Sequence, residues 1–205
     1  MRSLLIDTSS FFMHVAVLED KNVLYHFKEE IKMDMASRIV PVIEEAFQNL
    51  SFKIEDIDKI FVVNGPGSFT GIRVGVTAAK MIAWALKKDI ITLSSLEFLA
   101  TTSVDKKYHI PAIDARRGYV YAGVYDSELN CILKDQYILY TELSSYFEEG
   151  TIISHDNLEN SVRPKEDIVK IVEKHADDAP LNPHEVKPNY LKLTEAEEKK
   201  LAGAQ

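Results

Sequence analysis

Two aspartates could carry chemistry, because each stands at the end of a short apolar run that has the pattern of a β-strand. Asp7 follows residues 3–6, and Asp114 follows residues 109–113. Carboxylates placed in this way can orient a magnesium ion and a water molecule, as they do in enzymes that hydrolyse nucleotides. The pair therefore suggests a nucleotide site that is divided between two halves of the chain.

A structural role explains the same two aspartates. Asp7 can cap the polar turn through Thr8 and Ser9, and Asp114 can pair with Arg116 or Arg117. The second half of the chain contains no lysine placed to bind phosphate and no glycine-rich phosphate hairpin. We therefore favour the structural role, keep Asp7 and Asp114 only as weak candidates for cofactor binding, and expect no cofactor.

The most distinctive stretch is residues 64–75, which holds four of the eight glycines and lies between an apolar run and a long helical pattern. Its spacing misses the dinucleotide fingerprint, because Gly71 comes one residue too late after Gly65 and Gly67. It also lacks the lysine of a Walker loop and the pattern of a hydrolase elbow. We expect a tight strand-to-helix turn, with Ser68 or Thr70 as the helix N-cap.

The composition limits the possible functions. The chain has 205 residues, a net charge of −8 and 46% hydrophobic residues, which is enough for a sizeable core. Phosphate affinity comes mostly from Lys and Arg, so the acidic balance argues against binding nucleic acid alone. The single Cys131 excludes an internal disulfide and is expected to be a small core residue. The longest uncharged apolar stretch, residues 81–86, is too short to span a membrane, and a cytoplasmic protein is expected.

The order of elements predicts an α/β fold with two lobes. Residues 1–103 have the order βββαβαβα, which is that of the ribonuclease-H-like lobe in actin-like sugar kinases and chaperone ATPases. A charged break at residues 104–107 marks the boundary. Residues 104–205 restart the plan but end early, with a possible short strand at 189–192 and a tail helix at 194–201. The prediction is a two-lobed actin-like ATPase fold with a shortened second lobe.

Two helices of the first lobe, residues 35–50 and 72–86, have apolar stripes that are broader than one sheet-facing side requires. Gly71 and Gly75 are four residues apart and would let another helix approach closely. We interpret this surface as an interface with a copy or a relative, although a deeply buried pair inside one chain would explain the same pattern. The predicted interface residues are Met35, Ile39, Val42, Ile43, Ala46, Gly71, Arg73, Gly75, Val76, Ala79, Ile82 and Ala83.

Several motifs occur in an order that resembles the bacterial TsaB family, also called YeaZ. They are Ile6-Asp7-Thr8-Ser9, the run from Gly65 to Gly75, Asp114-Ala115-Arg116-Arg117-Gly118-Tyr119-Val120-Tyr121, and Pro188-Asn189-Tyr190-Leu191. The resemblance implies a role in making N6-threonylcarbamoyladenosine beside the anticodon of tRNAs that read ANN codons. It also implies a non-catalytic subunit that pairs with TsaD, the transferase, and is joined by TsaE, a small ATPase. Family members also form homodimers through the first-lobe helices.

The resemblance also gives a meaning to a histidine pair that this sequence lacks. TsaD-like relatives bind a metal through a His-x-x-x-His pair on the helix that corresponds to residues 35–50, and residues 33–39 here contain no histidine. We therefore expect a scaffold without an intact catalytic, metal or nucleotide site, which contacts tRNA only through the complex. The alternative is an ATP-dependent phosphotransferase or hydrolase of the actin-like class that uses Asp7 and Asp114. Direct binding of tRNA is a third and weaker hypothesis.

Overall fold

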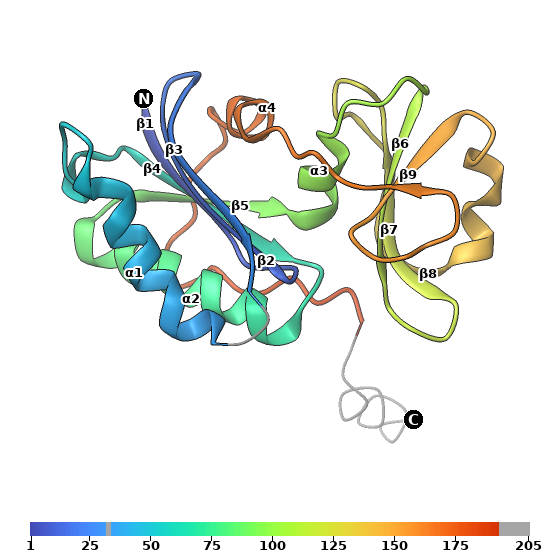
Figure 1. Ribbon diagram of the computed structural model, residues 1–205, viewed down its shortest axis with the longest axis horizontal. Helices are drawn as coiled ribbons and strands as arrows, with labels where there is room; N and C mark the ends of the chain where they lie inside the picture. Colours follow the sequence, from blue (N-terminus) through green and yellow to red (C-terminus); the bar gives the residue numbers. More distant parts are fainter. Residues whose placement is uncertain (32–33, 193–205) are drawn as a thin grey trace.

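Two five-stranded sheets form the two lobes of the chain (Figure 1). The computed structural model describes residues 1–31 and 34–192, so the tail helix expected at 194–201 lies outside the described residues. The first sheet has the order β3-β2-β1-β4-β5 and the second has the order β10-β9-β6-β7-β8. In both sheets the first three strands along the chain pair antiparallel, and the last two continue parallel to the first. This repeated topology confirms the predicted two-lobed actin-like ATPase fold.

The strands of the first sheet are β1 (Arg2–Asp7), β2 (Phe12–Glu19), β3 (Asn22–Glu30), β4 (Lys59–Gly65) and β5 (Asp89–Ser94). Those of the second are β6 (Tyr108–Asp114), β7 (Tyr119–Tyr125), β8 (Cys131–Leu139), β9 (Gly150–Ile153) and β10 (Ser161–Val162). The helices are α1 (Met35–Gln48), α2 (Phe69–Leu86), α3 (Ser95–Ala100) and α4 (Ile168–Lys174), with 3-10 turns at Ile54–Asp56 and Tyr140–Tyr146. Cys131, expected in the core, is exposed at the start of β8.

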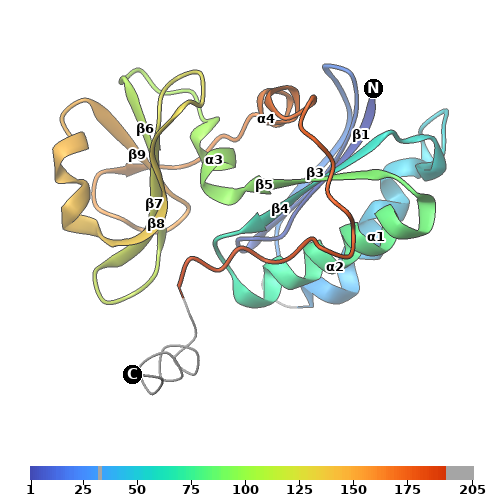
Figure 2. The ribbon, with the colours of Figure 1, turned by 180° about the vertical axis from the view of Figure 1, so that it is seen from behind.

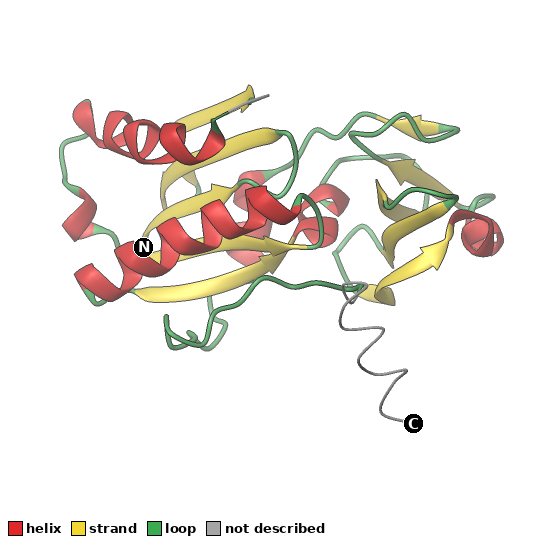
Figure 3. Cartoon of the chain, turned by 90° about the horizontal axis from the view of Figure 1, so that it is seen from below, coloured by secondary structure: helices red, strands yellow, loops and turns green. Residues whose placement is uncertain are grey.

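The first sheet is buried on both faces, because alternate residues of a strand point to opposite sides. Leu4 and Ile6 of β1 pack with α1 and α2, which lie side by side across one face (Figure 3). Leu5, between them, packs on the other face with residues of α3 and α4. Such two-sided burial explains why β1 and β4 read as nearly continuous apolar runs in the sequence.

Serine side chains cap the first turns of α2 and α3. Ser68 is the N-cap of α2, since its Oγ accepts a hydrogen bond from the Gly71 amide at 3.2 Å, as the sequence predicts. Ser94 caps α3 in the same way, through the amides of Leu96 and Glu97. The helix α1 begins at Met35, where the helical pattern of residues 35–50 begins, and Pro41 lies inside it.

The end of the described chain returns to the first lobe instead of completing the second (Figure 2). Leu181 forms an isolated bridge with Ile90 of β5, and Val186 is buried in the core beneath α1 and α2. The predicted strand at 189–192 is wrong. Asn189 instead donates a single backbone hydrogen bond of 2.7 Å to Asn64, which attaches this segment to the glycine turn.

The broad apolar stripes of α1 and α2 belong mostly to the core of this chain, which corrects their use as interface residues. The buried members are Ile39, Val42, Ile43, Ala46, Gly71, Gly75, Val76, Ala79 and Ala83. The close approach at Gly71 and Gly75 is made by Thr8 of the same chain, whose carbonyl and hydroxyl oxygens leave no room for a Cβ atom at either glycine. The deeply buried pair, weighed as the alternative, therefore describes these side chains.

By length and composition alone, α2 is apolar enough to cross a membrane. In the fold it is a core helix of the first lobe, with Ile72, Val76, Ala79 and Ala83 against the sheet. The length and composition of α2 are therefore explained by its place in the core of the lobe.

Two alanines on α2 separate its buried and outer faces. Ala79 is 0% exposed, whereas Ala85 is exposed. We expect Ala79→Arg to lower the free energy of unfolding by more than about 3 kcal/mol, because it forces an unpaired charge into a packed core. The matched Ala85→Arg change should stay within about 0.5 kcal/mol of the parent. Urea unfolding followed by circular dichroism measures both, and equal effects would contradict the assigned orientation of α2.

Candidate functional site

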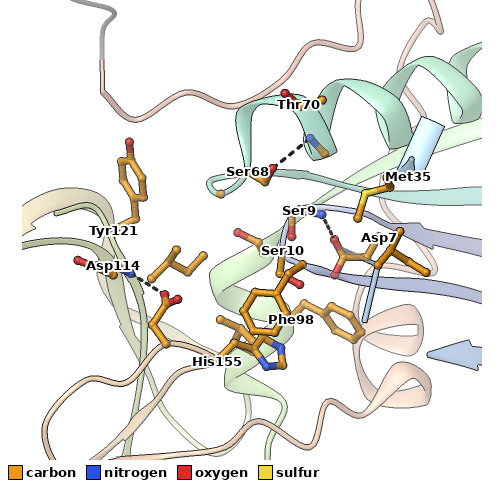
Figure 4. Close-up of a pocket in the computed structure, with 18 of the residues that line it drawn as sticks. Asp7, Ser9, Ser10, Met35, Ser68, Thr70, Phe98, Asp114, Tyr121 and His155 are labelled. Atoms are coloured by element: carbon orange, nitrogen blue, oxygen red, sulfur yellow. Dashed lines mark hydrogen bonds between the residues drawn. The ribbon is translucent and has the colours of Figure 1, made fainter. Parts of the chain in front are cut away.

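A cavity of about 510 Å³ lies between the lobes, at the carboxyl ends of the parallel strands of both sheets (Figure 4). Asp7 ends β1, Asp114 ends β6, Ser95 follows β5 and His155 follows β9 by one residue. Ligands of open α/β sheets bind at this kind of edge, where the strand ends leave a crevice. The position makes this cavity the candidate site.

Several residues singled out in the sequence meet around this cavity. They are Asp7, Met35, Gly67, Ser68, Thr70, Gly71 and Asp114. The glycine turn borders the cavity from the first lobe, and Asp114, Tyr121 and His155 line it from the second.

Asp7 is a buried carboxylate at the cavity wall, with 5% of the residue exposed. Its Oδ1 accepts a hydrogen bond of 2.7 Å from the Ser9 amide, which agrees with the predicted capping of the turn. Burial raises the pKa of Asp7 from 3.8 to about 6, and the bonds from Ser9 oppose the rise only in part. Asp7 is thus a carboxyl group whose charge is poorly compensated.

Asp114 stands across the cavity in an exposed position. Its Oδ1 accepts a hydrogen bond of 2.9 Å from the backbone amide of Arg116, so the expected partner is correct but the guanidinium is not used. Its own amide donates to the Asp156 carboxylate at 2.8 Å. The second lobe therefore presents two neighbouring carboxylates to the cavity.

His155 is a cavity residue that sequence reasoning missed. Its Nε2 lies 2.7 Å from Glu166 Oε1, and Lys28 Nζ lies 2.5 Å from the other oxygen of the same carboxylate. Burial by itself would raise the pKa of Glu166, but hydrogen bonds from His155 and Lys28 outweigh it and hold that pKa below its usual range. The sequence does carry one signal for His155, which is that it follows closely on the apolar run of residues 151–153, much as Asp114 follows residues 109–113.

The electrostatics of the cavity do not suit phosphate groups. Four carboxylates line it, those of Asp7, Asp34, Asp114 and Asp156, and no Lys or Arg stands among its lining residues in the described chain. The carboxylates also do not converge, since the described residues contain no group of three His, Cys, Asp or Glu that could hold a metal ion. Within the described lining, the nucleotide site suggested by Asp7 and Asp114 therefore has no Lys or Arg as a partner.

A second hollow, of about 460 Å³, runs between α1 and α2 on the outer surface of the first lobe. Of the predicted interface residues, Ile39 and Arg73 line it, together with Val40, Phe69, Val74, Thr77 and Met81 among others. The Arg73 guanidinium lies 3.8 Å from the centre of the Phe69 ring and donates to the Tyr190 hydroxyl at 2.8 Å. We call this hollow the α1–α2 groove.

Comparison with known proteins fits this architecture. A family model described as "TsaD: tRNA N6-adenosine threonylcarbamoyltransferase" matches residues 29–198. The fold is shared with YeaZ from Pseudomonas aeruginosa, at a TM-score of 0.79 and 22% identity over 93% of this chain and 99% of that one. The molecule is thus a two-lobed actin-like protein of the class that the TsaD model describes.

Relatives identified by sequence show more narrowly which family the chain belongs to. The chain is 31% identical to "tRNA threonylcarbamoyladenosine biosynthesis protein TsaB" of Bacillus subtilis, over 97% of both chains. The Escherichia coli protein of the same name is 33% identical over 64% of this chain and 58% of its own. The chain belongs to the TsaB family.

The burial of Asp7 should appear in the pH dependence of stability. An acid whose pKa is higher in the folded state favours folding while it is protonated. For Asp7 this contribution to stability is fully present below about pH 4 and is lost as the pH rises through about 6. We expect the stability of Asp7→Asn, relative to the parent, to improve by about 2 kcal/mol between pH 4 and pH 7.

Denaturant unfolding of both proteins at the two pH values measures this shift. Asp105→Asn, which removes an exposed carboxylate, controls for the change in net charge. A difference between Asp7→Asn and the parent that is the same at both pH values would contradict the burial of an ionisable Asp7.

Proposed function

We propose that this chain is a non-catalytic subunit in the biosynthesis of threonylcarbamoyladenosine in tRNA, and that it binds and activates a TsaD protein through the α1–α2 groove. The observation that carries the proposal is the exposed apolar surface of these two helices in a chain of the TsaB family. The same surface serves the homodimer, so self-association and binding to TsaD exclude one another.

The exposure of large apolar side chains on this face is high. Val40 is 54% exposed, and Met81 and Trp84 are each 65% exposed. Contiguous apolar surface around a groove is typical of a protein interface, and aromatic and Met side chains with Arg are enriched in such contacts. The interface is therefore assigned to the outer side chains Val40, Phe69, Arg73, Val74, Thr77 and Met81, in place of the buried stripe.

The groove also contains an arginine, Arg73, whose side chain is already held in place within the chain. Arg73 is fixed by the Phe69 ring and by the Tyr190 hydroxyl before any partner arrives. A side chain that is already ordered loses less entropy on binding, which favours it as an anchor. Arg73 was already among the interface residues predicted from the sequence, and we keep it in the proposed interface because its side chain is exposed in the groove.

The interlobe cavity supports the non-catalytic part of the proposal. Its four carboxylates would repel the phosphates of a nucleotide, and its described lining offers no cation to offset them. The net charge of −8 further supports contact with tRNA only through the complex. We also propose that TsaE is the additional subunit and that the complex works in the cytoplasm.

Charge placed in the α1–α2 groove should prevent the complex. We expect Thr77→Arg and Met81→Arg each to weaken binding to TsaD of the same organism by at least about tenfold, because both would bury an unpaired charge at the contact. Ser145→Arg, on the exposed surface of the second lobe, is the matched control and should bind as the parent does. Analytical ultracentrifugation of the mixtures measures the affinity. Unchanged binding by both groove variants would disprove this interface.

The rival function is an ATP-dependent enzyme that uses Asp7 and Asp114. We expect calorimetric titration of the isolated chain with magnesium-ATP to show no tight binding, and a phosphate-release assay to show no turnover. A tRNA modification assay with TsaD and TsaE, run with and without this chain, tests the accessory role directly. Turnover that is lost in Asp7→Asn would contradict a non-catalytic subunit.

A further inference from the structure

The carboxylates of the interlobe cavity are spread around its wall and not gathered at one point. Asp7 lies at the end of β1 in the first lobe, whereas Asp114 and Asp156 lie together in the second (Figure 4). Calcium and magnesium need several oxygens that converge on one position. Separated negative charges suit a ligand whose positive charges are also separated.

The wall between the two acidic ends is largely apolar. Phe98 and Leu99 come from the first lobe, and Ile113 and Tyr121 come from the second. Aromatic faces attract ammonium groups, and aliphatic side chains accept a methylene chain. The volume of about 510 Å³ falls within the range of pockets that enclose a small organic ligand.

Among the lining residues that the structure describes, none places a positive charge at the first-lobe end of the cavity. Burial raises the pKa of Asp7, and its protein partner is Ser9, which offers hydrogen bonds but no positive charge. The neighbouring His155 is held against Glu166 at 2.7 Å, and Lys28 is bound to that same glutamate. An ammonium group beside Asp7 would favour the ionised form of this carboxyl group. The ionised carboxylate would in turn attract the ammonium group of the ligand.

An anionic ligand fits the same cavity poorly. The α2 N-terminus borders it, but Ser68 Oγ already caps the Gly71 amide and the Ser68 amide donates to the Ser9 carbonyl. The four carboxylates outweigh the partial charge that remains at a helix terminus.

We propose that this cavity binds a linear aliphatic diamine or polyamine. One ammonium group lies beside Asp7, the methylene chain crosses the Phe98 and Ile113 wall, and a second ammonium group lies between Asp114 and Asp156. Such a ligand bridges the two lobes. The proposal rests on the cavity alone and is independent of the role in tRNA modification and of the α1–α2 groove.

Isothermal titration of the full chain with spermidine and putrescine tests the proposal. We expect both amines to bind, and we expect Asp7→Asn and Asp114→Asn each to lower the affinity by about tenfold or more, since each removes one end of a charge pair. Asn at position 7 can still accept from Ser9, and Asp114 is exposed, so both variants should fold. Asp105→Asn, with the same change in net charge away from the cavity, should bind as the parent does.

Three results would overturn the proposal. They are no heat of binding with either amine at millimolar concentration, full affinity in both Asp7→Asn and Asp114→Asn, or an equal loss in Asp105→Asn. Ethylamine separates a two-ended site from a single ammonium site: weaker binding than putrescine by about tenfold or more supports the bridge, and equal binding refutes it. None of these results depends on TsaD.

Discussion

The contact between the glycine turn and the β1–β2 turn is the constraint on which the rest of the molecule depends. The Ser68 amide donates to the Ser9 carbonyl at 2.7 Å, and the Thr8 hydroxyl donates to the Gly71 carbonyl at 2.7 Å. A Cβ atom at Gly67 or Gly71 would collide with the backbone of Ser9 or Thr8, so only glycine permits this approach. The contact places α2 against the sheet and brings its first turn and Asp7 to the same cavity.

This contact also explains the division of α2 into two functional faces. Its small residues are used inside the chain, where Gly75, Ala79 and Ala83 let the helix lie close to the sheet. The outer face is left with larger side chains, among them Met81 and Trp84, which are exposed and lie outside the described core of the lobe. A helix buried on one side and apolar on the other is suited to docking, because the fold itself does not depend on the second side.

The two lobes are tied together by polar contacts that surround the cavity. Lys28 of β3 reaches Glu166, which also holds His155 after β9, and Ser94 at the end of β5 donates to Asp135 of β8. Tyr125 donates to the same Asp135 at 2.5 Å. Buried networks whose members are satisfied favour a single arrangement, so these contacts hold the acidic walls at a fixed separation. The cavity is therefore a property of both lobes and of neither alone.

The sequence by itself determined the order of the elements in the first lobe and the turn that opens α2, because these follow from local periodicity and from nearest-neighbour hydrogen bonds. It left the cap of α2 open between Ser68 and Thr70, and the structure selects Ser68. It also carried the family, through motifs such as the run from Gly65 to Gly75. Only the tertiary structure decided that Ile39, Val76 and Ala79 face the sheet of their own chain, since an apolar stripe is the same whatever covers it. It alone brought Asp7, Asp114 and His155 to one cavity. Asp114 and His155 meet through the parallel pairing of β6 with β9, and Asp7 reaches them only because the two lobes pack together.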